Sequence, residues 1–199
     1  MPALRFELII GCMFAGKSNE LVRRAKRLEA VGSKVLMVNH DHDTRTCKSV
    51  KTHDGVKVSA VKVSSLMSLI GTSFLQEADA ICIDEGQFFA DIGEFITSLE
   101  LYSALMGRSK TIVVSSLDGD MNRKPWRNIT DLVCLADSVT KVSALERLPD
   151  GEIVEANFSM LISDKEKHES NEVKIGAAET YKAVSRQTYI AEMLKRTTP

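Results

Sequence analysis

The sequence predicts a protein of the α/β class, in which helices cover a parallel β-sheet. Two observations lead to this class. Short segments rich in Val and Ile alternate with segments of helical periodicity up to about residue 142, a pattern typical of βαβ units. In addition, residues 80–84 and 111–115 are nearly continuous apolar runs, as expected for strands buried on both faces of a sheet.

The elements of the sheet domain follow from these patterns. The expected strands are residues 4–10, 34–38, 80–84, 111–115 and 138–142. The clearest helix begins near Asp91, because a stripe of apolar residues recurs at helical spacing there. This stripe consists of Ile92, Phe95, Ile96, Leu99, Tyr102 and Met106. A second helix over residues 21–28 has a basic face that we expect to be solvated, formed by Arg23, Arg24, Lys26 and Arg27.

The chain changes character after Leu148. Pro149-Asp150-Gly151 predicts a turn, residues 152–162 predict a strand or hairpin, and residues 181–195 predict a closing helix. We therefore expect two domains, an α/β nucleotide-binding domain over residues 1–142 and a small annex over residues 143–199.

Composition excludes several classes of protein. The 199 residues are 44% hydrophobic and 27% charged, as in an average soluble domain. A net charge of −1 provides no field for nucleic acid or an anionic membrane, and no apolar run is long enough to span a bilayer. The N-terminus lacks the pattern of a signal peptide. We expect a cytoplasmic protein with no nucleic-acid or membrane partner.

Metal-binding patterns are weak. The four cysteines form no C-x-x-C pair, so neither a zinc knuckle nor a redox motif is predicted. His40-Asp41-His42 has the residue types of a metal site, but no second cluster lies nearby. We interpret it as a polar loop.

The most informative stretch matches the phosphate-binding pattern G-x-x-x-x-G-K-[ST]. It consists of Gly11, Cys12, Met13, Phe14, Ala15, Gly16, Lys17 and Ser18. It lies between an expected strand and an expected helix, as the pattern requires. Its glycines let backbone N–H groups surround a phosphate, Lys17 would contact the β- and γ-phosphates, and the Ser18 hydroxyl would bind Mg²⁺. The sheet domain is therefore predicted to be a P-loop domain of the RecA-like kind.

A second informative segment covers residues 81–89. An apolar strand that ends in aspartate is the usual companion of a phosphate loop, so Asp84 is expected to hold Mg²⁺ directly or through water. Glu85 follows at the carboxyl end of the sheet, where its carboxylate suits proton abstraction from an alcohol or orientation of a water. Phe88 and Phe89 fit either a core position or stacking on a planar base, and the sequence favours neither.

Six segments in a fixed order resemble the zinc-containing thymidine kinase family of animals, poxviruses and many bacteria. They are residues 11–18, Asp43-Thr44-Arg45, Thr52-His53-Asp54, residues 84–89, Leu117-Asp118-Gly119 and Arg123-Lys124-Pro125. The similarity extends from about residue 7 to residue 189 and is dense up to residue 142. It implies ATP and Mg²⁺ as cofactors, a homotetramer or homodimer, and an annex that forms a lasso-like lid over the nucleoside.

The resemblance implies a role for each matching residue. Glu85 matches the general base that deprotonates the nucleoside 5′-hydroxyl. The expected phosphate-binding residues outside the loop are Asp43, Thr44, Arg45, Asp84, Gly86 and Gln87, and Ser18 and Asp84 would hold Mg²⁺. The expected nucleoside-binding residues are Met13, Gln87, Phe88, Leu117, Met121, Trp126, Glu172, Val173, Lys174, Ile175, Gly176 and Tyr181.

The chain departs from the family in the annex. By position, the family's four zinc ligands fall on Glu146, Pro149, Ser185 and Thr188. Proline has no side-chain donor for a metal, and no Cys or His cluster replaces the set. We therefore expect no structural zinc, and an annex held by packing or by contacts between subunits.

The predicted function is transfer of the γ-phosphate of ATP to the 5′-hydroxyl of thymidine, in deoxynucleoside salvage for DNA synthesis. The alternative is a catalytically silent relative that keeps the nucleotide site and serves as a regulatory or assembly subunit. The presence of both Lys17 and Glu85 favours the enzyme. A generic P-loop ATPase is disfavoured, because it does not predict residues 84–89 together with residues 117–119.

Overall fold

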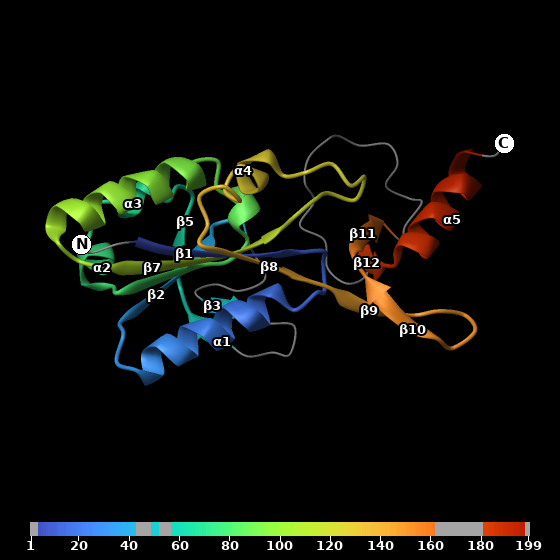
Figure 1. The fold of residues 1–199 in the computed structure, drawn as a ribbon, viewed down its shortest axis with the longest axis horizontal. Helices are drawn as coiled ribbons and strands as arrows, with labels where there is room; N and C mark the ends of the chain where they lie inside the picture. The colour runs from blue at the N-terminus through green and yellow to red at the C-terminus, as the bar shows by residue number, and fades with distance from the viewer. Residues whose placement is uncertain (1–3, 43–48, 52–56, 162–180, 198–199) are drawn as a thin grey trace.

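A six-stranded parallel sheet forms the centre of the molecule (Figure 1), as seen in a computed structural model that describes residues 4–42, 49–51, 57–161 and 181–197. The strand order is β5-β2-β6-β7-β1-β8. The strands are β1 (Leu4–Gly11), β2 (Val35–His40), β5 (Val61–Val63), β6 (Ala80–Ile83), β7 (Lys110–Leu117) and β8 (Ser138–Val142). All of their pairings are parallel, so the predicted α/β class is confirmed.

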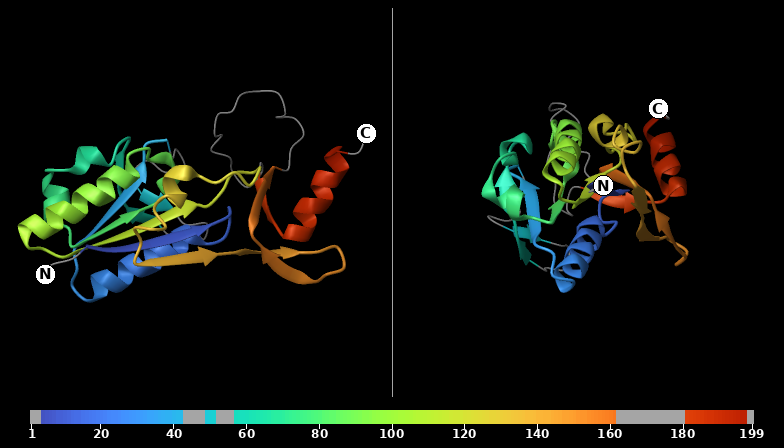
Figure 2. Two further views of the ribbon diagram at one scale, coloured as in Figure 1. Left: turned by 45° about the horizontal axis from the view of Figure 1, so that its top comes forward. Right: turned by 60° about the vertical axis from the view of Figure 1, so that its left-hand side comes forward.

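Helices cover both faces of this sheet (Figure 2). α1 (Lys17–Ala30) lies on one face, and α3 (Ile92–Met106) lies on the other. The short helices α2 (Ser73–Glu77) and α4 (Arg127–Thr130) contribute apolar side chains to the core beneath α3. None of the helices in these described ranges has the length and apolar character needed to cross a membrane.

The alternation of side chains along β1 divides the core into two layers. Phe6 and Leu8 are buried in the layer under α3, whereas Ile9 is buried in the layer under α1. The expected stripe of α3 is buried from Ile92 to Leu99 and only partly buried at Tyr102. The expectation that Met106 belongs to this stripe was wrong, because its side chain is 58% exposed in the last turn of α3.

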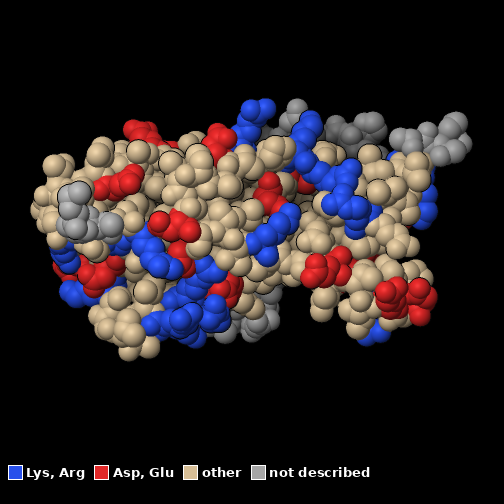
Figure 3. Space-filling model, in the orientation of Figure 1, with Lys and Arg blue, Asp and Glu red and all other residues tan. Residues whose placement is uncertain are grey.

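The basic face of α1 is only partly solvated. Figure 3 shows Lys and Arg side chains gathered over this helix. Arg24 departs from the expectation, since its guanidinium group lies 2.7 Å from Glu7 Oε2 and 2.8 Å from Glu20 Oε1. It also donates a hydrogen bond to Thr140 Oγ1 at 2.9 Å. Arg24 therefore attaches α1 to strands β1 and β8.

The described residues of the C-terminal annex form two antiparallel strand pairs and a helix. β9 (Ala144–Arg147) pairs with β10 (Ile153–Ala156), and β11 (Phe158–Leu161) pairs with β12 (Tyr181–Val184). Residues 152–162 were expected to form a strand or hairpin, and the strand alternative is confirmed, because they contain β10 and β11. These two strands do not pair with each other: β10 pairs with β9 across the turn expected at residues 149–151. The helix expected from residue 181 begins later, as α5 (Arg186–Thr197). The boundary at residue 142 between two domains stays a prediction.

Two further strands lie before β5 in the sequence and were not expected. β3 (Ser49–Lys51) and β4 (Lys57–Ser59) form an antiparallel pair outside the central sheet. Strand segments of three residues carry too little periodicity to be predicted.

Gly11 at the end of β1 is required for the close approach of β8. It lies opposite Val142, and an added Cβ would collide with the Val142 carbonyl oxygen. We expect Gly11→Ala to lower the free energy of unfolding by about 1–3 kcal/mol, as overpacking does, when measured by urea unfolding.

Gly93 in α3 provides the matched control. A Cβ there meets only Leu132 Cδ2, at 3.9 Å. Since alanine is the better helix former, Gly93→Ala should raise the free energy of unfolding by roughly 0.5–1 kcal/mol. Equal stabilities for the Gly11 and Gly93 variants would contradict this account of Gly11.

Candidate active site

The phosphate loop connects β1 to the first turn of α1. Phe14 and Gly16 have φ angles of 63° and 79°, which lie in the left-handed region. Gly16 immediately precedes α1, and its carbonyl accepts the Glu20 N–H at 3.0 Å. The loop thus ends at a helix N-terminus, where backbone N–H groups and the helix dipole favour bound phosphate.

Lys17 provides a buried positive charge inside this loop. Its Nζ donates a hydrogen bond to the Cys12 carbonyl oxygen at 2.7 Å. Burial lowers the pKa of Lys17 below its ordinary value, while the negative charges of Glu85 and Asp84 act in the opposite direction. The ammonium group therefore lies among carboxylates and is poorly hydrated, which strengthens its attraction for a phosphate.

Asp84 lies directly after β6, beside the start of α1. Its carboxylate is buried and accepts hydrogen bonds from Ser115 Oγ and, at 3.1 Å, from Ser18 Oγ. The two residues expected to hold Mg²⁺ are therefore in direct contact. A carboxylate and a hydroxyl are the oxygen donors that Mg²⁺ prefers, so the residues fit this ion. Ser115 was not predicted to belong to the site. The feature that could have indicated it is its place as a polar residue at the carboxyl end of an apolar strand.

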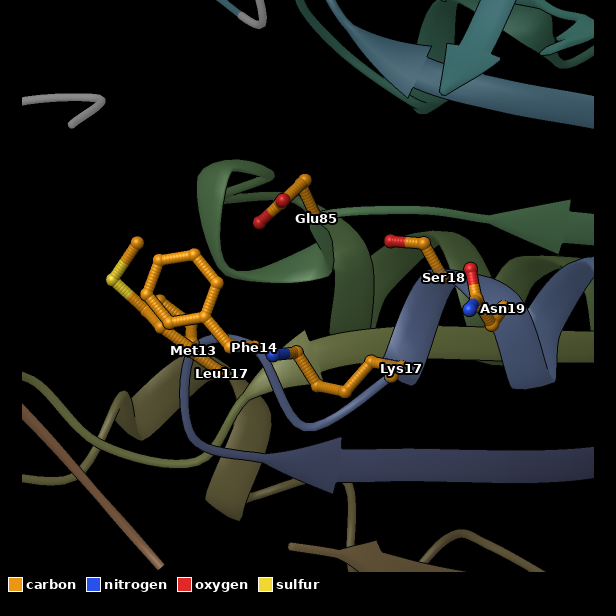
Figure 4. A pocket seen from close by; sticks show the side chains of 8 residues that line it. Met13, Phe14, Lys17, Ser18, Asn19, Glu85 and Leu117 are labelled. Carbon is orange, nitrogen blue, oxygen red and sulfur yellow. The ribbon is translucent and has the colours of Figure 1, made fainter. Parts of the chain in front are cut away.

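Glu85 faces the phosphate loop across one cleft (Figure 4). The residues that line the cleft are Met13, Phe14, Gly16, Lys17, Ser18, Asn19, Glu85 and Leu117. Glu85 adopts φ 54° and ψ 45°, a left-handed conformation that costs a non-glycine residue about 1–3 kcal/mol. In Figure 4 the Glu85 carboxylate lies on the side of the cleft opposite Phe14 and Lys17.

The Gln87 side chain holds the Glu85 carboxylate through a hydrogen bond. Gln87 Nε2 donates to Glu85 Oε2 at 2.6 Å, and Gln87 Oε1 accepts from Ser116 Oγ at 2.8 Å and from the Leu117 N–H at 3.1 Å. The Gln87 side chain is buried. It thus connects Glu85 to the end of β7. The sequence suggested contacts with phosphate and nucleoside for Gln87, and did not suggest this one.

Gly86 permits the tight turn between these two residues. It begins the 3-10 helix η2 (Gly86–Phe88), and an added Cβ would lie 2.8 Å from Val114 Cγ1. The structure therefore gives Gly86 a packing role next to Glu85.

The two phenylalanines have different surroundings. Phe89 is fully buried in the core under α3, so the core alternative holds for this residue. Phe88 is half-buried, with its ring centroid 5.9 Å from that of His40.

The His40-Asp41-His42 segment is only partly the polar loop that was expected. His40 ends β2 and is buried, and its Nδ1 accepts the His42 N–H at 3.0 Å. Burial lowers the pKa of His40, which favours the neutral imidazole. The Nδ1 lone pair of His40 is thus used within the segment itself, at the end of β2.

Residues 118–126 form a small hairpin that follows Leu117. Asp120 N donates to the Lys124 carbonyl oxygen at 2.9 Å, and Gly119 bridges to Pro125. Trp126 packs against the central core, while Met121 is 40% exposed at the tip. Tyr181, the remaining described residue of the expected nucleoside set, lies half-buried at the start of β12.

Several expected site residues lie outside the described ranges. They are Asp43, Thr44, Arg45, Glu172, Val173, Lys174, Ile175 and Gly176, together with the Thr52-His53-Asp54 segment. Their roles stay predictions.

The four positions of the family's zinc ligands do not fit zinc in this chain. Pro149 lies in the turn between β9 and β10. The Ser185 N–H donates to Glu146 Oε2 at 2.7 Å, and the Ser185 and Thr188 hydroxyl groups hydrogen-bond at 3.2 Å. One carboxylate and two alcohols are not a zinc donor set. Across the described ranges, no three His, Cys, Asp or Glu residues gather around a point where a metal could bind.

Burial acts to raise the pKa of Glu146, but hydrogen bonds from Ser185 and Thr188 outweigh it and hold this pKa below the usual value. Glu146 is therefore an anion engaged with its neighbours in the annex.

The arrangement defines a class of protein. A phosphate loop after the first strand of a parallel sheet, an aspartate beside its serine, and a second carboxylate across the cleft are the parts of a P-loop phosphotransferase.

Comparison with known proteins identifies the family within this class. The sequence model of the family described as "Thymidine kinase" matches residues 4–189. The chain is 37% identical over 185 residues to the thymidine kinase of myxoma virus (strain Uriarra), covering 93% of this chain and 96% of that protein. It is 38% identical over 182 residues to that of Yaba monkey tumor virus (strain VR587), covering 92% of each. The chain belongs to the thymidine kinase family, whose members use ATP.

Proposed function

We propose that this chain transfers the γ-phosphate of ATP to the 5′-hydroxyl of thymidine. The observation that carries the proposal is the position of Glu85, a carboxylate that faces Lys17 and the phosphate loop within one cleft. A phosphoryl acceptor in this cleft would have its hydroxyl between the base and the phosphate, as in-line transfer requires.

Each group in or beside the cleft has a distinct task. The loop N–H groups and Lys17 bind the phosphates of ATP. Ser18 and Asp84 would hold Mg²⁺, which when bound neutralises negative charge on those phosphates. Glu85 accepts the proton of the 5′-hydroxyl as the new bond from the 5′-oxygen to the γ-phosphorus forms. The bond from the γ-phosphorus to the bridging oxygen breaks, ADP leaves, and the proton passes from Glu85 to solvent.

For every residue expected to bind the nucleoside, contact with the nucleoside remains a proposal. Met13 and Leu117 line the cleft itself, and Phe88 borders Gln87 in η2. We place Met121, Trp126, Tyr181 and residues 172–176 around the base. A homotetramer or homodimer in the cytoplasm likewise stays a prediction.

A direct assay tests the proposed function. Purified protein is incubated with ATP, Mg²⁺ and radiolabelled thymidine, and we expect thymidine monophosphate and ADP in equal amounts. ATP binding without phosphorylation of any nucleoside would instead identify the catalytically silent relative.

Metal analysis of the purified protein tests the absence of structural zinc. Because the ligand positions hold Glu146, Pro149, Ser185 and Thr188, we expect a zinc content far below one equivalent per chain, and a melting temperature that chelators do not change. A full equivalent of zinc that survives dialysis would contradict this prediction.

A further inference from the structure

A hydrogen-bonded cluster joins β9 to the start of α5. Ser185 immediately precedes the helix and is 6% exposed. Its backbone N–H donates to Glu146 Oε2 at 2.7 Å, and its Oγ accepts the Thr188 N–H at 3.2 Å. The second bond is the contact of an N-cap residue, so Glu146 is attached to the residue that fixes where α5 begins. Glu146, Ser185 and Thr188 are called the clasp below.

The clasp determines the position of Tyr189, the next residue of α5. The Tyr189 N–H donates to the Ser185 carbonyl oxygen at 3.0 Å, and the Tyr189 side chain is 3% exposed. Its ring packs against Phe158, with the two ring centroids 5.7 Å apart. A displaced start of α5 would therefore displace this buried ring.

Tyr189 in turn holds the hairpin of residues 118–126. Its O–H donates to the Met121 carbonyl oxygen at 3.0 Å. The Arg123 guanidinium carbon lies 4.4 Å from the centroid of the same ring, and Arg123 adopts a left-handed φ of 61°. One aromatic side chain thus makes two contacts with the tip of the hairpin, which reaches toward β11 and α5 in Figures 1 and 2.

The base of the hairpin belongs to the candidate site. Leu117, which precedes it, lines the cleft, and the Leu117 N–H donates to the side chain that holds Glu85. Trp126, at the other end, packs on the central core. The hairpin is therefore fixed at its base by the sheet and at its tip by Tyr189.

We propose that Glu146, Ser185 and Thr188 act as a metal-free clasp that, through Tyr189, positions the 118–126 hairpin at the nucleoside side of the active site. The three are positioning residues, because they act through Tyr189 and touch no reacting group. The effect on the nucleoside rests on the proposed function, whereas the placement of the hairpin does not.

Trp126 provides a readout that is independent of catalysis. It is the only tryptophan of the chain and lies at the end of the hairpin. Its emission spectrum and its quenching by acrylamide report how the hairpin packs. The test compares Glu146→Ala and Tyr189→Phe with Glu155→Ala, which removes an exposed glutamate from the neighbouring strand β10.

We expect Glu146→Ala and Tyr189→Phe both to shift the emission of Trp126 and to increase its quenching. Both should raise KM for thymidine about tenfold, the factor expected for one lost hydrogen bond, with kcat and KM for ATP changed by less than about twofold. Glu146→Gln keeps an oxygen that can accept the Ser185 N–H, so it should restore most of the wild-type behaviour. Glu155→Ala should match the wild type.

Unchanged emission and unchanged KM for thymidine in Glu146→Ala would overturn the clasp, whatever Tyr189→Phe shows. If Glu146→Ala does not fold, Ser185→Ala decides in its place, because it removes the oxygen that caps α5 and should shift the emission of Trp126 in the same way. Tyr189→Phe leaves the clasp intact and tests only the contact between α5 and the hairpin. If the wild type phosphorylates no nucleoside, the proposed function fails, and the emission of Trp126 in the same variants still decides the clasp.

Discussion

Replacing Glu85 by glutamine should lower kcat for thymidine phosphorylation by about 10²- to 10⁴-fold, the usual contribution of a general base. Glutamine has nearly the same shape, and its amide can still contact Gln87, so the turn at residues 85–87 should be preserved. What is lost is the ability to accept the proton of the 5′-hydroxyl. KM for ATP should change little, because Glu85 is not part of the phosphate loop.

Steady-state kinetics with purified wild type, Glu85→Gln and Glu100→Gln measure this effect. Glu100 lies exposed on α3, far in sequence from the loop, and its substitution controls for the loss of one negative charge. Comparable rates for Glu85→Gln and the wild type would remove Glu85 from the mechanism.

The sheet domain was predictable because its signals are local. Each of the five expected strands is found in the central sheet, since apolar runs such as residues 80–83 admit few alternatives once helices flank them. The phosphate loop was equally predictable, because its glycines and Lys17 occur at the spacing that defines the phosphate-binding pattern. The contact of Ser18 with Asp84 then follows from parallel strands ending at the same edge.

The annex was less predictable because its structure depends on long-range pairing. Residues 181–184 were assigned to a helix, but they form β12 because β11 offers an antiparallel partner. The helix begins only where Ser185 caps it. Gln87 illustrates the same limit within the site. The sequence suggested that it contacts a ligand. It did not suggest the hydrogen bonds of its side-chain amide with Glu85, Ser116 and Leu117, because these depend on the alignment of β6 with β7.

Lys17→Met should lower kcat by about 10²- to 10³-fold, the cost of removing one preorganised charge that stabilises a transition state. The methionine side chain can occupy the space of the lysine stem, but it carries no charge for the phosphates. Among the described residues, Glu85, Asp84 and Asp118 all act on the charge of Lys17, so its loss also leaves a more negative cleft. KM for ATP should therefore rise together with the fall in kcat.

The same substitution should not destabilise the fold. Burial depresses the pKa of Lys17, so at pH values below that pKa the folded state must hold an ammonium group that the unfolded chain hydrates better. Removing the charge relieves this cost, and the melting temperature of Lys17→Met at pH 7 should equal or exceed that of the wild type. Lys26→Met, on the exposed face of α1, is the matched control and should change neither activity nor stability. A Lys17→Met protein that melts well below the wild type would show that Lys17 mainly stabilises the loop through its bond to Cys12, and the lost activity could not then be assigned to phosphate binding.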